Sequence, residues 1–434
     1  MVSFLSFLLP LSSLGAAQSF FAPLENHPSI VQARLGLEAA QAQVRAIQSP
    51  VSLNTQGGFS FFQNRDPLPS TDPACRSPAT AAQCVALPSD GRQVQVGLSF
   101  TPIPFGDVAD ALNRAQIGAE QAALGLRSAR AQLEASAIEG ALRIRLAQAG
   151  LEVARAAQRL AQASLEATRI RAQRDAANPG EVRQAEAQVR SAAIQVSDAE
   201  RSLALARQSL SDLLGSADAA PPAVALPPPQ TPPSVRQAQF GVGSAQVQYD
   251  GAIRGVLPVL NASYTRNTSP NDSLTASINS RTLQPSISYS NTSQARTEPS
   301  VRIDGTFTIG FSATIALGVV DALEAAQKQV DAANQAVEAA RRNAKTQEDL
   351  LRSQLQTADL NLANAVQGRA DAEKTLAEAR ERERLGLTSP LATVQAELGL
   401  AQALLALEQA QLSRTSRILD LYRFYALPVS EVNR

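Results

Sequence analysis

The spacing of apolar residues along the first half of the chain changes from a helical period to strict alternation and back again. Residues of about 28–48 have the helical spacing and begin at Pro28, a residue that suits the first turn of a helix. Apolar and polar residues then alternate over about 51–62 and 94–100, which predicts two strands. The segment between them, about 63–90, is rich in Pro, Asp and Ser and is expected to be a loop.

A very long helix is predicted after the second strand, because no proline interrupts residues of about 107–175. At 1.5 Å per residue, roughly 69 residues give a helix of about 100 Å. A helix of that length needs partners along its side, since a compact domain cannot bury it. Residues of about 181–214 follow a turn at Pro179 and predict a shorter helix that returns beside the long one.

The second half of the chain repeats this order of elements. Pro28 to Gln43 resembles Pro233 to Gln248, and Gln184-Ala185-Glu186 matches Gln395-Ala396-Glu397. We therefore divide the chain into a first repeat at 18–215, a Pro-rich linker at 216–232 and a second repeat at 233–434. The second repeat is expected to have strands at about 256–264 and 301–307 and helices at about 319–386 and 391–425. We leave open a further short hairpin near Ser286 to Tyr289, within the Asn/Ser/Thr-rich loop.

Apolar and small residues recur every seven positions along both long helices, which is the period of a coiled coil. The stripe in the second repeat is Leu323, Val330, Val337, Ala344, Leu351 and Ala358, and its equivalent in the first is Leu112, Ala119, Leu126, Leu133, Gly140 and Ala147. A simple dimeric coiled coil would explain this stripe equally well. It would not explain the strands or the duplication.

The N-terminus has the features of a secretory signal peptide, predicted at 1–17, with an apolar run at 4–11 and small residues at Gly15-Ala16-Ala17. An ordinary apolar N-terminus is the alternative. No later segment has about 18 uninterrupted apolar residues, so we expect no membrane-spanning helix. Cys75 and Cys84 are expected to form a disulfide in an oxidising compartment, with two free thiols as the alternative.

The composition excludes several classes of function. The chain has 39 basic and 39 acidic residues, whereas a nucleic-acid binder needs a basic surface. A single His argues against a His-based metal site or catalytic triad. Ser, Asp and Glu never occur in a nucleophile-elbow or phosphate-loop pattern. We therefore predict no enzymatic activity, no cofactor, no metal and no nucleic-acid partner.

The predicted fold is mainly α with a small β part, and its strands pose a problem of closure. Four strands per chain are too few for a closed barrel, and open sheet edges do not occur in lipid. Several chains must therefore share one barrel. Three chains, for example, would supply twelve strands for a transmembrane barrel and six helical hairpins around a tunnel, so the sequence predicts a hollow oligomer with a membrane end and a long periplasmic end.

The chain resembles the outer-membrane factor family typified by TolC across its mature length. The similarity is carried by Pro28 to Gln43 and its copy, by Phe105-Gly106 and Leu317-Gly318, and by Arg384 to Thr388 with Val394 to Leu398. The resemblance implies a homotrimeric α/β barrel in the outer-membrane lipid, with its helical part in the periplasm. It further implies a passive conduit, docked to a periplasmic adaptor and an inner-membrane pump, for tripartite efflux or type I secretion.

Two other functions remain as alternatives at this point. The first is a secreted, periplasm-spanning structural coiled-coil protein, which would have no use for four strands. The second is an enzyme or binding domain inside the loop near 265–298, which the low apolar content of that loop disfavours.

The resemblance also implies which residues face the partner proteins. In that family the turn between the long and short helices is the tip that contacts the adaptor, which here assigns Gly386, Leu387, Thr388 and Pro390. The first repeat has Asp175, Asn178 and Pro179 instead, so we expect the two tips to differ. A plain helix C-cap at Gly386 is the other interpretation, and both can hold.

Charged residues near the tips are candidates for the pore entrance. Three copies of Glu181 would form a ring of carboxylates, and Arg169 and Arg171 match Arg380 and Arg382 in the second repeat. One interpretation is favourable placement of cations near helix C-termini, worth about 0.3–1 kcal/mol each. The sharper hypothesis is that these arginines weaken the preference of the entrance for cations.

Overall fold

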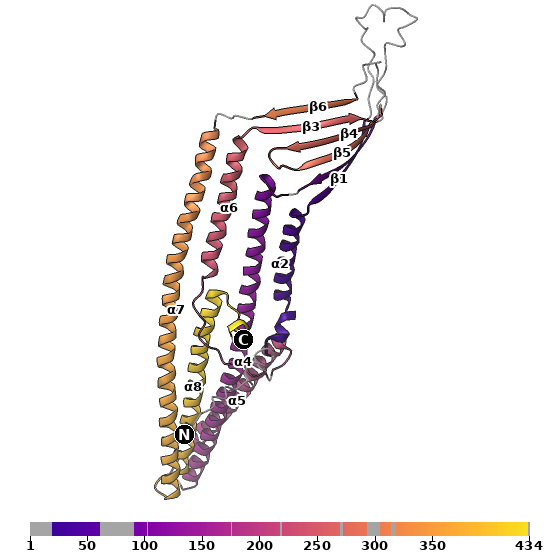
Figure 1. The fold of residues 1–434 in the computed structure, drawn as a ribbon. Helices are drawn as coiled ribbons and strands as arrows, with labels where there is room; N and C mark the ends of the chain where they lie inside the picture. Colours follow the sequence, from indigo (N-terminus) through magenta and orange to yellow (C-terminus); the bar gives the residue numbers. More distant parts are fainter. Residues whose placement is uncertain are drawn as a thin grey trace, which may run out of the picture. The chain divides into compact units, whose positions relative to one another are not determined.

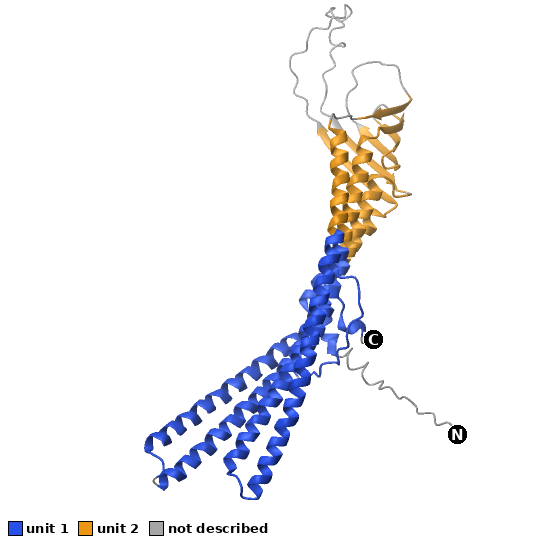
Figure 2. Cartoon of the chain, turned by 90° about the vertical axis from the view of Figure 1, so that its left-hand side faces the viewer, with its two compact units in different colours: residues 1–37, 121–238, 337–434 blue, residues 38–120, 239–336 orange. Residues whose placement is uncertain are grey.

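The computed structural model describes residues 20–60, 91–101, 103–174, 176–217, 219–269, 272–292, 304–313 and 318–432. The chain forms two compact units, distinguished by colour in Figure 2: unit 1 comprises 1–37, 121–238 and 337–434, and unit 2 comprises 38–120 and 239–336. Each sequence repeat contributes residues to both units. The compact units are therefore not the repeats, and the repeat boundaries at 18–215 and 233–434 stay predictions.

Unit 1 consists of two helical hairpins with short helices beside them. The long helices are α4 (Asp107–Gln173) and α7 (Val319–Arg384), which both begin in unit 2. The returning helices are α5 (Pro179–Leu214) and α8 (Pro390–Tyr425), and both hairpins are visible in Figures 1 and 2. The short elements are η1 (Ala22–Asn26) and α9 (Val429–Val432). The predicted long and returning helices are thus confirmed to within two residues at each end.

The seven-residue stripe is the face on which the hairpins pack. Val337, Ala344, Leu351 and Ala358 of α7 are buried. In the first repeat the small residue at Gly140 has a specific neighbour, because a Cβ atom there would lie 3.2 Å from a methyl group of Leu210 on α5. Small residues in the stripe therefore let the helices approach closely, as the coiled-coil pattern predicts.

The core of unit 1 joins segments that are far apart in the sequence. Ile138 of α4, Leu210 of α5 and Leu419 of α8 are almost fully buried in one cluster with Leu24 of η1. Tyr422 belongs to the same cluster, and its hydroxyl donates a hydrogen bond of 3.0 Å to the carbonyl of Ala225. Burial raises the pKa of Tyr422 to about 12. The Pro-rich linker is therefore fixed to the core although it forms no helix or strand.

A buried carboxylate on α4 holds the last short helix. Glu134 is 5% exposed, and its two oxygens accept hydrogen bonds of 2.9 Å from the backbone N–H of Ser430 and 2.6 Å from its hydroxyl. Ser430 lies in the first turn of α9, where a negative group is favourable. Burial raises the pKa of Glu134 despite these hydrogen bonds, because removal from water penalises the charged form.

Unit 2 contains parts of several helices and one sheet. Parts of α2 (Pro28–Ile47) and α6 (Pro233–Val256) lie in it. The sheet has the order β1-β2-β5-β4-β3-β6, and every neighbouring pair is antiparallel. The strands are β1 (Val51–Ser60), β2 (Gly91–Phe100), β3 (Val259–Asn267), β4 (Asp272–Asn279), β5 (Pro285–Thr292) and β6 (Gly305–Ser312).

The prediction of four strands was wrong, because the described residues form six. The two additional strands, β4 and β5, lie in the Asn/Ser/Thr-rich segment, where only a short hairpin near Ser286 to Tyr289 was left open. Most side chains of β4 are small or polar, so its apolar signal is weak although apolar and polar residues alternate along it. The strand expected at 256–264 also begins later, at Val259, because α6 continues to Val256. The strand expected at 301–307 is β6, Gly305–Ser312.

One described helix, α8, is long and apolar enough by length and composition to cross a membrane. Two of its glutamates are ion-paired in unit 1: Glu397 with Arg380 of α7, and Glu408 with Arg145 of α4. Its C-terminal residues Leu419 and Tyr422 belong to the core. These contacts are those of a helix packed in a bundle.

The predicted signal peptide at 1–17 and the predicted disulfide between Cys75 and Cys84 lie outside the described residues. Both stay predictions.

Glu134 makes the stability of unit 1 depend on pH. Below the ordinary carboxyl pKa of 4.5 the side chain is protonated in the folded and unfolded states alike. As the pH rises above that value the unfolded chain ionises first, so the free energy of unfolding falls until the folded-state pKa is passed. We expect Glu134→Gln to flatten this fall in a series of thermal unfolding midpoints between about pH 4 and 8.

The matched control is Glu166→Gln, which changes an exposed glutamate of the same helix. If Glu134→Gln and Glu166→Gln gave the same pH profile, Glu134 would not be the source of the dependence.

Candidate functional site

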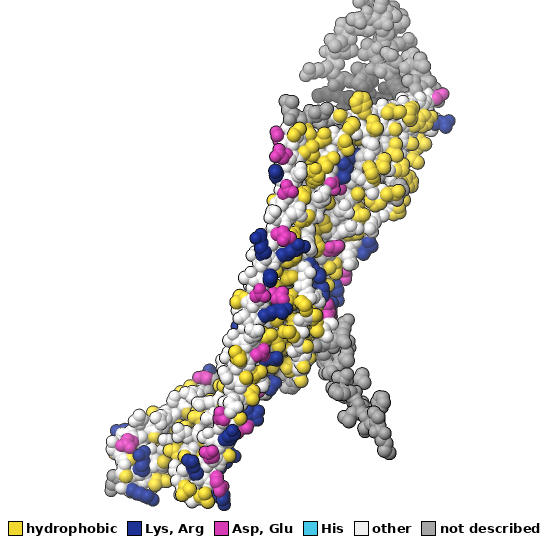
Figure 3. All heavy atoms as spheres, turned by 60° about the vertical axis from the view of Figure 1, so that its left-hand side comes forward, with side chains coloured by type: hydrophobic (Ala, Val, Ile, Leu, Met, Phe, Trp, Pro, Cys, Tyr) yellow, Lys and Arg dark blue, Asp and Glu magenta, His cyan; other side chains and the backbone are white. Residues whose placement is uncertain are grey.

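One face of the sheet is apolar and exposed. The strand register places Leu98 of β2 beside Ile287 of β5, and Ile287 beside Ala276 of β4. The side chains of this face alternate along the strands, and each is more than a third exposed in the single chain. They are Leu53, Val94, Val96, Leu98, Leu260, Tyr264, Leu274, Ile278, Ile287, Tyr289, Phe307, Ile309 and Phe311. Figure 3 shows hydrophobic side chains gathered over the sheet.

The opposite face of the sheet is polar and neutral. Its side chains hydrogen-bond across neighbouring strands: Ser277 with Ser286 at 2.7 Å and Thr265 with Thr275 at 3.0 Å. Serine, threonine, asparagine, glutamine and glycine fill nearly all of its positions, and no described strand residue on this face is charged. The apolar face carries charged side chains at one end of the strands, among them Arg266 and Asp272. A sheet with one largely apolar face and one polar face has the pattern of a membrane barrel wall.

The tip of the second hairpin is a glycine-dependent turn. Gly386 has φ +71°, its N–H donates to the carbonyl of Glu383 at 2.9 Å, and the N–H of Leu387 donates to Arg382 at 2.8 Å. This pair of hydrogen bonds is the Schellman arrangement that ends a helix at a left-handed residue. Pro390 then begins α8. The C-cap interpretation of Gly386 is therefore confirmed, while adaptor contact stays a prediction.

The tip of the first hairpin has a related backbone but different side chains. The N–H of Ala176 donates to the carbonyl of Arg171 at 2.8 Å, which is the equivalent of the bond between Leu387 and Arg382. Asn178 caps α5, since its side-chain oxygen accepts from the N–H of Glu181 at 2.9 Å, and Pro179 is the first helical residue. Asp175 lies outside the described residues.

The surfaces of the two tips differ in hydrophobicity. Leu387 is 72% exposed and Leu385 is 56% exposed, whereas the position equivalent to Leu387 in the first repeat is Ala176. The hydroxyl of Thr388 is buried and has no hydrogen-bond partner in the described structure. The second tip thus exposes two leucines.

The predicted entrance charges are partly neutralised by ion pairs. Arg169 of α4 pairs with Glu186 of α5 at 2.9 Å, and Arg380 of α7 pairs with Glu397 of α8 at 3.0 Å. These are the same positions in the two repeats, so the ion pair is duplicated with the hairpin. The sequence comparison aligned Glu186 with Glu397 without assigning them as partners. Both pairs are largely exposed and each contributes less than about 1 kcal/mol.

The remaining predicted charges are not paired across a hairpin. Arg171 donates to the hydroxyl of Thr168 at 3.3 Å on its own helix. The side chains of Arg382 and Glu181 form no ion pair with a described residue. Of the five candidate charges, Arg169 and Arg380 are therefore ion-paired across their hairpins. The other three, Arg171, Arg382 and Glu181, are available to solvent.

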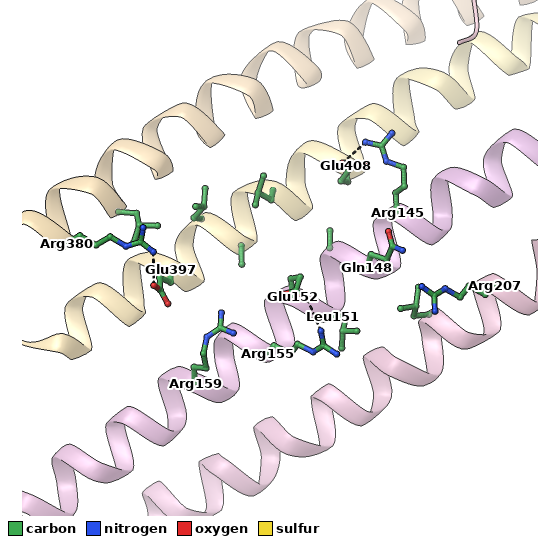
Figure 4. A pocket seen from close by; sticks show the side chains of 16 residues that line it. Arg145, Gln148, Leu151, Glu152, Arg155, Arg159, Arg207, Arg380, Glu397 and Glu408 are labelled. Atoms are coloured by element: carbon green, nitrogen blue, oxygen red, sulfur yellow. Dashed lines mark hydrogen bonds and ion pairs between the residues drawn. The ribbon is translucent and has the colours of Figure 1, made fainter. Parts of the chain in front are cut away.

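A groove with a net positive lining lies among α4, α5, α7 and α8 in unit 1 (Figure 4). Its volume is about 910 Å³. Arg145 is joined to Glu408 across the groove, and Arg155 to Glu152 along α4. Arg159 and Arg207 also line it and form no ion pair with a described residue. Sequence reasoning did not find this groove, because its lining comes from four helices.

His27 and the described acidic residues offer no metal site. His27 lies between η1 and α2, where its Nδ1 accepts a hydrogen bond of 3.3 Å from the N–H of Ser29. Within the described part of the chain, no group of three or more His, Cys, Asp and Glu residues is placed to hold a metal. His27 is thus a helix-boundary residue.

Comparison with protein-family models gives a match to the outer membrane efflux protein model at residues 22–216 and again at 230–426. The two matches cover both repeats and most of the chain. The chain belongs to the outer membrane efflux protein family. A search of curated proteins returned no match.

Solved structures with this fold include three outer-membrane proteins. VceC from Vibrio cholerae is 18% identical, with 96% of each chain covered and a TM-score of 0.64. The CmeC channel of Campylobacter jejuni is 15% identical, with 96% of this chain and 86% of that chain covered and a TM-score of 0.63. The MtrE channel of Neisseria gonorrhoeae is 18% identical, with coverage of 96% and 89% and a TM-score of 0.60.

These similarities confirm the predicted family, the predicted mainly α fold and its two repeats. The predicted location, the outer membrane with the helical part in the periplasm, agrees with the family. The family is one of efflux channels and not of enzymes.

The turn at Gly386 can be tested by giving it a side chain. An alanine at positive φ is strained by about 1–2 kcal/mol, so we expect Gly386→Ala to speed amide hydrogen exchange in the tip by roughly 5–30-fold. Gly368→Ala is the control, because Gly368 lies inside α7 with open space around it. That variant should leave exchange in the tip unchanged. Equal exchange in Gly386→Ala and the wild type would show that the turn does not need glycine.

Proposed function

We propose that the chain is one subunit of a homotrimeric outer-membrane channel in a tripartite efflux or type I secretion system. The channel is a passive conduit from the periplasm to the exterior, and a partner pump supplies the energy. The observation that carries this proposal is the sheet, which has an exposed apolar face, a neutral polar face and two open edges, β1 and β6.

The open edges explain why one chain is insufficient. Among the described residues, β1 and β6 each have a strand neighbour on one side only, so a row of backbone groups on each has no partner within the described sheet. In lipid each such group would cost several kcal/mol. Because the described sheet has an even number of antiparallel strands, β6 of one copy would run antiparallel to β1 of the next. Identical copies can therefore close a barrel without breaking the antiparallel pattern.

A closed barrel of identical copies also supports the helical part of the proposal. Three copies bring six helical hairpins together, which is enough to surround a tunnel. The family resemblance supports three copies as the number that closes. The alternative, a structural coiled-coil protein of the periplasm, leaves the apolar face of the sheet exposed to water, where burial of the face would be favourable.

The tips are the proposed contact with the periplasmic adaptor and, through it, with the inner-membrane pump. The exposed Leu385 and Leu387 support this assignment for the second tip. The first tip has Ala176 at the equivalent position, which supports a weaker contact there. Thr388, Pro390, Asn178 and Pro179 shape the two turns, and Asp175 remains a proposed contact by its place in the sequence.

The entrance charges are proposed to tune ion preference. Glu181 and Arg382 are solvent-accessible charges without an ion-pair partner in the described residues, and Arg171 is bonded only to a hydroxyl. Arg169 and Arg380 have a second role, since each holds the two helices of its hairpin together.

The subunit proposal is tested by membrane fractionation and gel electrophoresis. The full-length protein should be recovered in the outer-membrane fraction. Unheated samples in mild detergent should migrate as a trimer that heating converts to a monomer, because a closed barrel resists dissociation. A soluble dimer in the periplasmic fraction would contradict the proposal and support the structural coiled-coil alternative.

The tip proposal predicts that a negative charge introduced at equivalent positions of the two tips weakens adaptor binding unequally. Leu387→Asp should weaken binding of the cognate adaptor at least about tenfold, which corresponds to about 1.4 kcal/mol. Ala176→Asp is the matched control at the equivalent position and should have a smaller effect. Binding is measured on purified trimers with the adaptor in solution. Equal losses in the two variants would contradict a preference for the second tip.

The entrance proposal predicts a change in ion selectivity. Arg380→Gln and Arg382→Gln each remove one positive charge per subunit, so both variants should raise the cation preference of channels in planar bilayers. The reversal potential in a salt gradient measures this preference. Unchanged ion selectivity in both variants would contradict the proposal and would leave these arginines only a structural role at the helix ends.

A further inference from the structure

We propose that β4 and β5 are wall strands of the membrane barrel, so that three copies of this chain form a barrel of eighteen strands. The sequence alone suggested four strands per chain and hence twelve. The inference rests on the trimer of the proposed function and adds a specific architecture to it. A wider barrel would admit larger solutes from the exterior side.

The hairpin is part of the sheet and not an appendage to it. β5 pairs with β2 from Gln93↔Thr292 to Ser99↔Ser286, and β4 pairs with β3 from Asn261↔Asn279 to Asn267↔Ser273. The two strands thus lie between the strand pairs contributed by the two repeats. No direct pairing of β2 with β3 exists in the described sheet, because the hairpin separates them.

The hairpin also extends across the height of the sheet. Its turn lies at the end where β2 leads into α4: the amide of Gln284 donates to the hydroxyl of Thr101 at 2.7 Å, and Arg281 lies 3.5 Å from the carboxylate of Asp107. Gly106 has φ +58°, and a Cβ atom there would collide with the carbonyl oxygen of Arg281. The backbone at Gly106 therefore passes so close to the turn of the β4–β5 hairpin that only glycine fits there.

The side chains of the hairpin continue both faces of the wall. Leu274, Ala276 and Ile278 of β4 and Ile287 and Tyr289 of β5 lie on the apolar face, in register with their neighbours. The serines of the hairpin lie on the polar face, and they are Ser273, Ser277, Ser286, Ser288 and Ser290. A hairpin that left the wall would not need this alternation, because both of its faces would meet the same solvent.

The strands β4 and β5 can be inserted between β2 and β3, or removed, without changing the antiparallel order of the sheet. Two strands added between β2 and β3 keep the number of strands even, so the antiparallel pattern is unbroken. Without them, β2 and β3 would still be antiparallel neighbours. Since the diameter of a barrel grows roughly linearly with strand number, eighteen strands would give a barrel roughly 1.5 times as wide as twelve.

The first experiment measures which side chains face water in the assembled trimer. Single cysteines are placed at Ser288, Ser277 and Ile287 in a Cys75→Ser, Cys84→Ser background, and trimers in membranes are treated with a hydrophilic thiol reagent. The wall assignment predicts rapid labelling of Ser288→Cys and Ser277→Cys, which would face the lumen. It predicts at least tenfold slower labelling of Ile287→Cys, which would face lipid. Similar rates at Ser288→Cys and Ile287→Cys, whether fast or slow, would overturn the inference.

The second experiment removes the hairpin and measures the width of the barrel. Residues 268–303 are replaced by an Asn-Gly turn, which can close because the N–H of Asn267 already lies 3.1 Å from the carbonyl of Asp304. The control replaces residues 61–90 by the same turn between the paired Ser60 and Gly91, which removes a long segment and none of the six described strands. Electron cryomicroscopy of the trimers gives the barrel diameter.

The wild type and the control should show eighteen strands, and the hairpin deletion a narrower barrel of twelve. An unchanged diameter in the deletion variant would overturn the inference while leaving the channel proposal intact. If the deletion variant does not assemble, the labelling pattern at Ser288→Cys and Ile287→Cys decides alone. Absence of any trimer in the wild type would instead refute the proposed function.

Discussion

Backbone groups that lack hydrogen-bond partners cannot remain in lipid, and this constraint governs the arrangement of the whole chain. The backbone groups of the internal strands are paired with antiparallel neighbours on both sides. Among the described residues, β1 and β6 each have one edge whose backbone groups lack such a partner. Its apolar face is exposed in the single chain and its other face is neutral and polar. In the proposed trimer, closure with further copies of the chain would satisfy both edges, place the apolar face against lipid and leave the polar face on the lumen.

The two helical hairpins have the same arrangement and differ in the side chains at their tips. Both hairpins have the same cross-hairpin ion pair, Arg169 with Glu186 and Arg380 with Glu397, and both end with the same backbone hydrogen bond across the tip. The side chains at the tips differ, since exposed Leu387 corresponds to Ala176. The two repeats thus share the framework of the hairpins, and the second tip is the more hydrophobic of the two.

The core of unit 1 connects this framework to both ends of the chain. Leu24 from the N-terminal segment, Tyr422 from α8 and the Pro-rich linker at Ala225 meet on α4. Glu134 adds a buried carboxylate that holds α9 through Ser430. The hydrogen bond between Tyr422 and Ala225 thus attaches the linker between the predicted repeats to the core of unit 1.

Much of the helical architecture could be predicted from the sequence, because long proline-free segments and a seven-residue stripe have few other solutions. The stripe residues Val337 and Leu351 are buried as expected. β4 could not be predicted with the same methods: Leu274, Ala276 and Ile278 alternate with small or polar residues but give a weak apolar signal, and its partners β3 and β5 are set by register. The groove lined by Arg159 and Arg207 was equally inaccessible, because it depends on how four helices pack.

The central claim is that β1 and β6 of neighbouring copies pair to close one shared barrel. It is tested most directly by cysteine pairs on the polar face of the two edges, with Ser52, Asn54 or Gln56 combined with Thr306 or Thr308, in a background without Cys75 and Cys84. Mild oxidation of the outer-membrane protein should join chains in at least one combination, and the ladder on a non-reducing gel should end at three copies. Crosslinks confined to single chains, or a ladder that ends at two copies, would contradict the account.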